Sequence, residues 1–509
     1  MFIAVFLDIV MADRLLKKIP YTFKDPSLLD TRSLIGGKWV EARSGKTFPV
    51  FDPEDNKEVC QVTDLDVDDV CAAIDAASEA FKTFKNAPHR ERRWLMRRWA
   101  DLIKENKDDL AAICTLELGK PFTESLVTVK YGTDFLDWFE GEIERVYGET
   151  IPAARGNNRI FTIKQPQGVV AAITPWNSPI AMVTRKVGAA IAAGNTVICK
   201  PAPETPLCAI AVAKLFERAG GPPGVLNIIT SSPETTPAVG AELCSNKLIR
   251  HLSFTGSTAV GRYLHTECSK TFKKTSMELG GNAPFIIFED ANIDKAVDGL
   301  ISSKFRSSGQ TCVCANRIFV HSSIISQFAS RLHTRLGETF TYGSVWDRNV
   351  NFGPLYSPKA FDKLTRQTKD ALERGGELIG EDPAKLQAQY GPNFYPPTIV
   401  TNANKDMLFM KEETFGPLAF LVPFETEEEA VAMANNVDAG LASYFYTEDI
   451  SRMYRVSEAL ESGMVGCRVG LISACEQPFG GIKDSGMGRE GGKGALDEYL
   501  NIKSVTVGI

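Results

Sequence analysis

The stretch "GVVAAITPWN" (Gly168 to Asn177) decides the fold. It is a continuous apolar run of strand length that ends in turn residues, and it follows an alternating, strand-like segment, "RIFTIKQP" (Arg159 to Pro166). A continuous apolar run of this kind is typical of a strand that is buried on both faces, as in a parallel sheet covered by crossover helices. The neighbouring sequence should therefore alternate between strands and helices.

The sequence after Asn177 has this alternation. The strand-like segments are "NTVICKP", "GVLNIIT", "LSFTG" and "APFIIFED", and the helical ones are "AMVTRKVGAAIAAG", "PLCAIAVAKLFERAG" and "TAVGRYLHTECSK". This order predicts a doubly wound nucleotide-type fold from Gly168 to about Leu279 and a second α/β region to about Gly480. Helical periodicity precedes it, in "DVCAAIDAASEAFKTF", in "WLMRRWADLIKENKDDLAAICTLELGK" and onward to about Gly148. The tail "NIKSVTVGI" alternates again and could pair with "RIFTIKQP".

The composition is typical of a soluble globular protein. The chain has 509 residues, 44% hydrophobic and 24% charged, and its net charge of −6 does not indicate a polyanionic partner. The densest basic run, "HRERRWLMRRW" (His89 to Trp99), has apolar residues at helical spacing. It predicts the solvated face of an amphipathic helix rather than a nucleic-acid patch. Eleven cysteines without regular spacing suit a reducing compartment.

The N-terminus, "MFIAVFLDIVMADRLLKK", begins with a short apolar run. It is interrupted by Asp8, lacks a basic leader and is too short to span a membrane. A weak signal function remains the alternative, with Met11 as a second possible start. We expect a cytoplasmic protein without a membrane or nucleic-acid partner.

Two cysteines, Cys312 and Cys314, stand one residue apart in "GQTCVCANR". A zinc site needs about four nitrogen or sulfur ligands, and none of the five histidines lies in an HExxH, HxH or Cys/His cluster. No metal site is expected. The chain also contains neither a G-x-S-x-G elbow nor a P-loop of the G-x4-G-K-[ST] form.

Three other short stretches carry weak signals. In "SFTGSTAVG", Gly256 and Gly261 follow a strand and open a helix, where a phosphate could approach the backbone; packing and turn requirements explain them equally well. Asn177 in "TPWNSP" could stabilise an oxyanion or serve only the turn. Glu278 in "MELGGNAP" is a carboxylate at a strand or helix end.

Together and in order, seven motifs resemble the aldehyde dehydrogenase superfamily, from about Leu34 to Val507. They are "ITPWNSP", "KPAPETP", "FTGSTAVG", "MELGGNAP", "GQTCVCANR", "EETFGPL" and "PFGGIKDSGMGREGG". The resemblance implies an α/β fold with a Rossmann-type cofactor domain, an α/β catalytic domain and a small β oligomerisation element. It also implies a homodimer or homotetramer. The corresponding ranges are 21–148 and 168–279 for the dinucleotide-binding domain, 280–480 for the catalytic domain, and 149–167 and 489–509 for oligomerisation.

The same resemblance implies a mechanism that suits these side chains. Cys312 would attack the aldehyde carbon, and the Asn177 amide with the Cys312 backbone N–H would hold the oxyanion. Glu278 would then activate the water that hydrolyses the thioester. Cys314 is either a small buried neighbour or the partner in a reversible, strained disulfide.

The cofactor implied by the resemblance is NAD or NADP. In strictly NAD-using relatives an acid three residues after the lysine binds the ribose, whereas here Pro203 stands there and Glu204 follows. The loss of that charge favours NADP or dual use. The candidate cofactor residues are Thr174, Pro175, Trp176, Lys200, Pro203, Glu204, Thr255, Gly256, Ser257, Glu413 and Phe415.

Two arginines narrow the substrate. Arg185 and Arg306 flank the candidate site in sequence, and either could be a structural ion pair; two together suggest recognition of a carboxylate. With "GLIS", which contains Ser473, they resemble the succinate-semialdehyde dehydrogenases, which implies succinate semialdehyde as the substrate. Arg468, where relatives usually show an asparagine-containing loop, could be a third cation or face solvent. Glutarate semialdehyde, an aromatic aldehyde or a non-catalytic structural role on this fold remain the alternatives.

Overall fold

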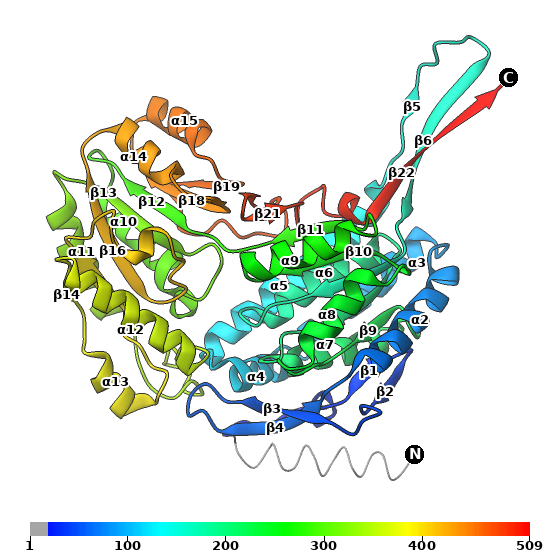
Figure 1. Ribbon diagram of the computed structural model, residues 1–509, viewed down its shortest axis with the longest axis horizontal. Helices are drawn as coiled ribbons and strands as arrows, with labels where there is room; N and C mark the ends of the chain where they lie inside the picture. The colour runs from blue at the N-terminus through cyan, green and yellow to red at the C-terminus, as the bar shows by residue number, and fades with distance from the viewer. Residues whose placement is uncertain (1–18) are drawn as a thin grey trace.

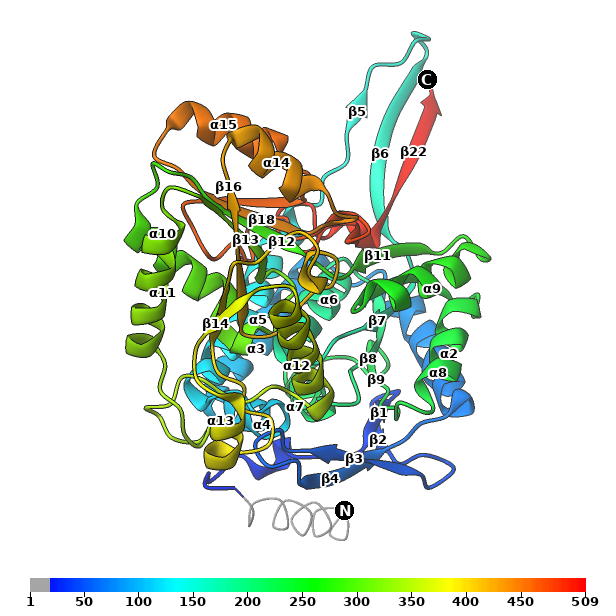
Figure 2. The same ribbon diagram turned by 60° about the vertical axis from the view of Figure 1, so that its left-hand side comes forward.

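The computed structural model describes residues 19–509, so the expectations for the N-terminal apolar run and Met11 lie outside the described residues. Two large sheets, each covered by helices, make up the body, and a narrow β arm projects from it (Figures 1 and 2). The expected α/β class is confirmed. Among residues 19–509, none of the helices combines the length and apolar character needed to cross a membrane.

The first sheet has eight strands in the order β2-β1-β9-β8-β7-β10-β11-β21. Five central strands run parallel, namely β9, β8, β7, β10 and β11. The outer strands are antiparallel to their neighbours. The order turns back at β7, which has β8 on one side and β10 on the other, as in dinucleotide-binding folds. The strands are β1 (Ser33–Ile35), β2 (Lys38–Val40), β7 (Val169–Ile173), β8 (Thr196–Lys200), β9 (Leu226–Ile228), β10 (Ile249–Thr255), β11 (Lys274–Glu278) and β21 (Gly486–Met487).

Helices cover both faces of this sheet. Alternate residues of β7 point to opposite cores: Val170 and Ala172 face the larger one, and Val169 and Ala171 face the other. Both faces of the strand are thus buried, which explains its unbroken apolar run. One core contains α3 (His89–Glu105), α4 (Lys107–Leu118), α5 (Phe122–Glu142), α6 (Pro179–Ala192) and α7 (Pro206–Arg218), and the other contains α2 (Val67–Phe84), α8 (Thr236–Ser245) and α9 (Thr258–Ser269).

Several elements differ from the sequence prediction, which did not include β1, β2 or β11. The long helical stretch divides into α3 and α4, because the Asn106 side chain donates to the Leu102 carbonyl and ends α3 there. The helix α8 was not predicted, although Pro237 lies in its first turn, where proline is common.

The second sheet has seven strands in the order β14-β15-β16-β13-β12-β18-β19, all parallel except β14. Its strands are β12 (Ala283–Ile287), β13 (Ala315–His321), β14 (Glu377–Ile379), β15 (Thr398–Thr401), β16 (Leu418–Phe424), β18 (Ala442–Tyr446) and β19 (Met464–Cys467). Its helices are α10 (Ile293–Leu300), α11 (Ile325–Thr339), α12 (Pro358–Glu373), α13 (Pro383–Tyr390), α14 (Glu427–Asn435) and α15 (Ile450–Ala459). The predicted domain boundaries stay a prediction; β21 lies between the predicted catalytic range and the C-terminal oligomerisation range and joins the first sheet.

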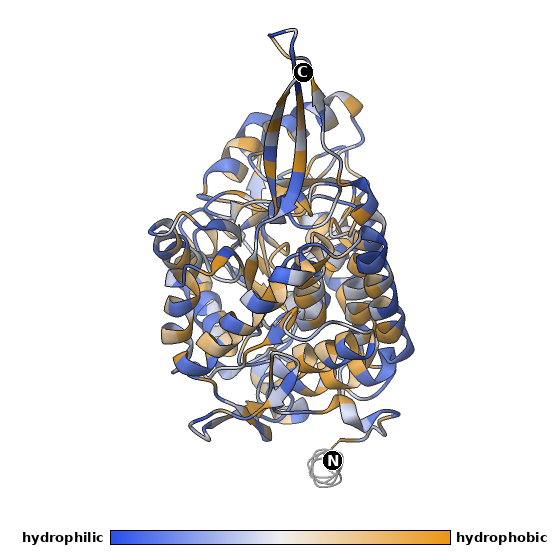
Figure 3. Cartoon of the chain, turned by 90° about the vertical axis from the view of Figure 1, so that its right-hand side faces the viewer, coloured by the Kyte–Doolittle hydropathy of each residue, from blue (hydrophilic) through white to orange (hydrophobic). Residues whose placement is uncertain are grey.

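The arm consists of β5 (Thr150–Ile151), β6 (Asn158–Pro166) and β22 (Leu500–Gly508). The predicted pairing of the tail with "RIFTIKQP" is confirmed, with antiparallel partners from Leu500 opposite Pro166 to Gly508 opposite Asn158. Apolar and polar residues alternate along the arm (Figure 3), and most of its side chains are at least partly exposed. Two further pairs complete the structure: β3 (Thr47–Phe51) with β4 (Glu58–Thr63), and β17 (Ala439–Gly440) with β20 (Ile482–Lys483).

Candidate active site

The candidate site lies where the carboxyl ends of the first sheet meet the second sheet. Asn177 follows β7, Gly256 follows β10 and Glu278 ends β11, and parallel strands bring such ends to one edge. Cys312 reaches them from the loop before β13. A pocket of about 400 Å³ opens here. Among its lining residues are Pro175, Trp176, Asn177, Thr255, Gly256, Ser257, Cys312, Glu413 and Phe415.

The loop that carries Cys312 has an unusual backbone. A π-helix, Ile301–Phe305, continues α10, and a tight turn then places Ser307, Ser308 and Gly309 in the left-handed region, with φ of 53°, 52° and 74°. Two serines in this region are strained. Their hydroxyls secure the turn, because Ser307 donates to Glu124 at 2.5 Å and Ser308 donates to the Gly353 carbonyl at 2.7 Å.

Gly309 is fixed by its surroundings. A Cβ at this position would lie 2.4 Å from the carbonyl carbon and oxygen of Gly416, so only glycine fits. Phe415, before Gly416, also has a positive φ, of 53°. The loop with Cys312 and the loop with Glu413 to Phe415 therefore contact each other through their backbones.

Cys312 is half-buried and lines the pocket. Burial, together with the Glu278 carboxylate and against the lowering effect of Arg185, raises the pKa of its thiol to about 12. The thiol therefore holds its proton until a base removes it. Cys314 is buried, with its Sγ 2.9 Å from the Thr311 hydroxyl. All eleven cysteines are free thiols, and the redox role of Cys314 stays a prediction.

Asn177 is a buried side chain with one fixed contact. Its Nδ2 donates to the Gln310 carbonyl at 3.1 Å, and since Nδ2 carries two protons, the second remains for a ligand. Gln310 is fixed in turn, because its Oε1 accepts from the Tyr356 backbone N–H at 2.9 Å. The buried ammonium of Lys120 donates to the Asn177 carbonyl at 3.1 Å. In the sequence, Lys120 is the last residue of the segment predicted as helical.

Glu278 belongs to a buried cluster of four charges. Arg185 donates from Nη2 to Glu278 Oε2 at 2.8 Å and also pairs with Glu490, while Lys186 pairs with Glu490 and donates to Ser253 at 3.0 Å. Burial raises the pKa of Glu278 to about 8, against the lowering effect of Arg185. Glu490 lies in the quoted "GMGREGG" motif, but neither it nor Lys186 was singled out.

The cofactor candidates surround the pocket. Ser257 is the N-cap of α9 and accepts from the Val260 N–H at 3.5 Å, and the Thr255 hydroxyl is buried without a hydrogen-bond partner among residues 19–509. Glu413 accepts from the Gly281 N–H at 3.2 Å, and burial raises its pKa to about 7. The helix N-terminus can bind phosphate oxygens, so these residues fit a nicotinamide dinucleotide.

The remaining cofactor candidates are divided between two places. Trp176 stacks on Tyr356, with ring centroids 3.8 Å apart, and meets Phe415 edge-on at 5.6 Å. The Thr174 backbone N–H donates to the Lys200 carbonyl at 3.1 Å, at the ends of β7 and β8. The Lys200 ammonium is buried and donates to the Pro201 carbonyl at 3.3 Å. Pro203 is half-buried and Glu204 is exposed in the loop that follows.

The two candidate substrate arginines differ in burial and in whether they form ion pairs. Arg185 is fully enclosed, with its guanidinium carbon 4.4 Å from the Phe479 ring centroid. Arg306 is half-buried; within residues 19–509 it forms no ion pair, and its Nε is buried with no hydrogen-bond partner. Ser473 is half-buried in the loop after β19. Arg468 donates to the Thr447 carbonyl at 2.7 Å and pairs with Glu448 at 3.4 Å.

In the described range, no group of three or more His, Cys, Asp or Glu side chains is placed to hold a metal ion.

Comparison with known proteins gives one consistent result. The model of the "Aldehyde dehydrogenase family" matches residues 39–505. An NADP(+) succinate-semialdehyde dehydrogenase of Schizosaccharomyces pombe is 51% identical, covering 96% of this chain and 98% of that protein. The mitochondrial succinate-semialdehyde dehydrogenase of Mus musculus is 46% identical over 94% and 91%. A solved structure of an NADP-dependent enzyme of E. coli superposes with a TM-score of 0.93 at 46% identity, covering 96% of this chain and all of that one.

Proposed function

Because this chain belongs to the aldehyde dehydrogenase family, we propose that it oxidises succinate semialdehyde to succinate with reduction of NAD(P)+. The observation that carries the substrate is Arg306, an arginine without an ion-pair partner in the described chain, six residues before the nucleophile. Arg306 is half-buried with its Nε enclosed, and a substrate carboxylate would supply the missing counter-charge. The names of the 46–51% identical relatives support the same substrate.

The reaction begins at Cys312. Its thiolate adds to the aldehyde carbon, and the proton of the thiol passes to a base, for which Glu278, whose charge acts on the thiol, is the candidate. The aldehyde oxygen becomes an oxyanion, which the free Nδ2 proton of Asn177 and the Cys312 backbone N–H would hold. Nicotinamide dinucleotide, when bound along Thr255, Ser257 and Glu413, supplies a hydride acceptor.

A thioester on Cys312 then remains to be hydrolysed. Glu278 takes a proton from a water molecule, the water oxygen adds to the acyl carbon, and the C–S bond breaks. The acid leaves and the thiol is restored. The ordinary pKa of a glutamate is too low for an efficient base near neutrality, whereas the raised value of about 8 suits this step.

The far carboxylate of the substrate is assigned to Arg306, Ser473 and the remaining donor of Arg185. Within residues 19–509, Nη1 of Arg185 is buried with neither a hydrogen-bond nor an ion-pair partner, so Arg185 can add a contact without giving up its ion pairs. A planar guanidinium can bind a carboxylate through two parallel hydrogen bonds.

NADP is the proposed preferred cofactor. Pro203 provides no carboxylate to repel a 2′-phosphate, and among the described residues the Lys200 ammonium donates only to a carbonyl. The NADP(+) relatives named above support this choice. The variant Pro203→Glu should raise the KM for NADP at least about tenfold while changing that for NAD much less. Equal KM values for NADP in wild type and variant would contradict the assignment.

Substrate preference can be tested by measuring the absorbance of reduced nicotinamide as it forms. The substrates are succinate semialdehyde, glutarate semialdehyde and benzaldehyde, each with NAD and with NADP. We expect the highest kcat/KM for succinate semialdehyde with NADP. One methylene changes affinity by only about 1–3 kcal/mol, so glutarate semialdehyde should be a slower substrate rather than none. A preference for benzaldehyde would overturn the carboxylate assignment.

Assembly and location stay predictions. A homodimer or homotetramer formed through the arm is testable by light scattering after gel filtration, with a chain that ends before Leu500 as the comparison. A cytoplasmic location is testable by cell fractionation, which is informative because the mouse relative is named a mitochondrial enzyme.

A further inference from the structure

Arg185 already forms ion pairs with two carboxylates of the protein, so it is not a free cation reserved for a substrate. Its Nη2 is 2.8 Å from Glu278 Oε2, and its Nε pairs with Glu490. The residue is 1% exposed, and its guanidinium packs against Phe479 at 4.4 Å and, more distantly, against Phe135 at 5.9 Å. Its rotamer is therefore fixed by aromatic contacts as well as by charge.

The two oxygens of Glu278 differ as a result. Oε2 accepts from Arg185, whereas Oε1 is buried and has no hydrogen-bond partner in the described part of the chain. A carboxylate held by one oxygen presents the other in a single orientation. Because Oε1 is the oxygen left for a water molecule, the ion pair determines which way the base points.

We propose that Arg185 is a positioning residue for Glu278, which orients the carboxylate and keeps it available as a base during thioester hydrolysis, whether or not the substrate carries a carboxylate. The proposal rests on the proposed function only in the roles of Cys312 and Glu278. It adds a second task to Arg185, separate from substrate binding.

The charges that face Glu278 predict how its titration responds to substitution. Arg185 and Lys186 on α6 and Arg489 near β21 lower its pKa, whereas Glu490, in the same segment as Arg489, raises it. Tyr131 on α5 and the Cys312 thiol also lie within electrostatic reach of this group. Removing Arg185 should move the pKa of Glu278 above about 8, and removing Glu490 should move it below.

The test uses the full-length protein without cofactor and the uncharged ester 4-nitrophenyl acetate. Cys312 Sγ bonds to the acetyl carbon, the ester C–O bond breaks, and nitrophenol leaves; water then hydrolyses the acetyl thioester with Glu278 as base. A burst of nitrophenolate reports acylation, and the steady rate reports hydrolysis of the thioester.

In Arg185→Gln we expect a burst of wild-type amplitude that forms more slowly, since Arg185 lowers the pKa of the Cys312 thiol. The steady rate should be about 10- to 100-fold lower, with a pH profile shifted to higher pH. Arg185→Lys, which keeps the charge, should recover part of the rate. Arg452→Gln, the same change at a distant arginine with three carboxylate partners, should behave as wild type.

Glu490→Gln covers the case in which Arg185→Gln does not fold. It removes the neighbour that raises the pKa of Glu278, so the pH profile of the steady rate should shift to lower pH. Unchanged profiles in the folded variants, or an effect of Arg185→Gln only on the KM for succinate semialdehyde, would overturn the proposal. Wild type that hydrolyses the ester but does not oxidise succinate semialdehyde would overturn the proposed function instead.

Discussion

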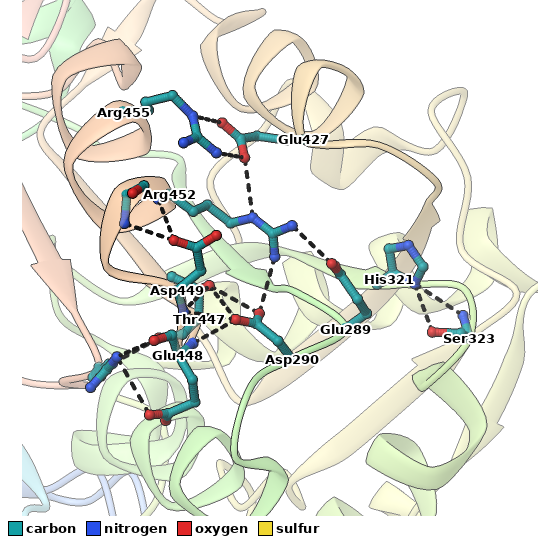
Figure 4. A network of polar contacts seen from close by, with 12 residues as sticks. Glu289, Asp290, His321, Ser323, Glu427, Thr447, Glu448, Asp449, Arg452 and Arg455 are labelled. Carbon is teal, nitrogen blue, oxygen red and sulfur yellow. Dashed lines mark hydrogen bonds and ion pairs between the residues drawn. The ribbon is translucent and has the colours of Figure 1, made fainter.

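Two arginine-centred clusters in this protein use the same groups and do different things. Near the surface of the second sheet, Arg452 binds Glu289, Asp290 and Glu427 at 2.8, 3.0 and 3.1 Å (Figure 4). In the interior, Arg185 binds Glu278 and Glu490. Arg452 is 17% exposed and Arg185 is 1% exposed.

Burial decides how the carboxylates in the two clusters titrate. Around Arg452, hydrogen bonds from the arginines overcome partial burial, and the pKa values of Glu289 and Glu427 lie below their ordinary range. Around Arg185, burial dominates, and the pKa of Glu278 rises to about 8 although an arginine is in contact. The first arrangement serves stability, and the second yields a group that can exchange a proton near neutral pH.

Replacing one glutamate in each cluster should produce the largest contrast. Glu278→Gln should lower kcat for aldehyde oxidation about 10²- to 10⁴-fold, because the base for thioester hydrolysis is lost, while a burst of reduced nicotinamide persists. Glu427→Gln, the same change in the outer cluster, should leave kcat within about twofold. Stopped-flow and steady-state assays measure both. Similar losses in the two variants would remove the functional distinction between the clusters.

A third arginine extends the comparison, because Arg306 has no carboxylate partner in residues 19–509. Arg306→Ala should raise the KM for succinate semialdehyde about 10- to 100-fold, since charge-assisted hydrogen bonds to the substrate are lost. The KM for butanal, which lacks the carboxylate, should change little. An unchanged KM for succinate semialdehyde would mean that the empty guanidinium is not its binding site.

Stability should respond to pH through Glu278 and not through Asp290. The folded pKa of Glu278, about 8, is above its ordinary value, so its contribution to stability falls as pH rises from about 4.5 to 8 and then levels off. The Tm of Glu278→Gln relative to wild type should therefore increase between about pH 6 and pH 8.5. The relative Tm of Asp290→Asn should stay constant there, because the pKa of Asp290 is lowered and it remains ionised throughout. Parallel curves for the two variants would contradict the assigned pKa directions.

The smallest expected effect comes from Arg452 itself. Arg452→Ala removes three partly solvated ion pairs, each worth about 0.2–1 kcal/mol, and should lower Tm by a few degrees with no change in kcat. The loss should shrink in about 0.5 M NaCl, which screens exposed charges. A salt-independent loss would indicate that packing of Arg452 on Phe288, 4.5 Å away, matters more than its charge.

The sequence predicted what depends on local pattern. The strand-end position of Asn177 follows from an apolar run and turn residues, whereas Glu278 was predicted only at a strand or helix end. The alternation in "RIFTIKQP" and in the tail was enough to predict their pairing. The family resemblance supplied the proposed roles. The contacts that distinguish the arginines could not be predicted in this way.

Those contacts join residues that are far apart in the chain. Lys186 and Glu490 are separated by 304 positions, and Arg185 and Glu278 by 93, so no local periodicity connects them. Arg185 and Arg306 look equivalent as letters, and only burial and ion pairing separate them. The helix α8 was missed for a local reason. Its ten residues include two alanines and one glycine, so its sequence carries little amphipathic signal.

The close approach of Gly309 to Gly416 has a consequence for redesign. No methyl group fits between the backbones of Gly309 and Gly416. The loop of Cys312 and the loop of Glu413 to Phe415 are therefore expected to move together. An engineer who widens the pocket by moving either loop will displace the other by a similar amount. Substitutions that change cofactor choice are therefore better made at Pro203, in a separate loop after β8, than in the two closely packed loops beside the Cys312 thiol.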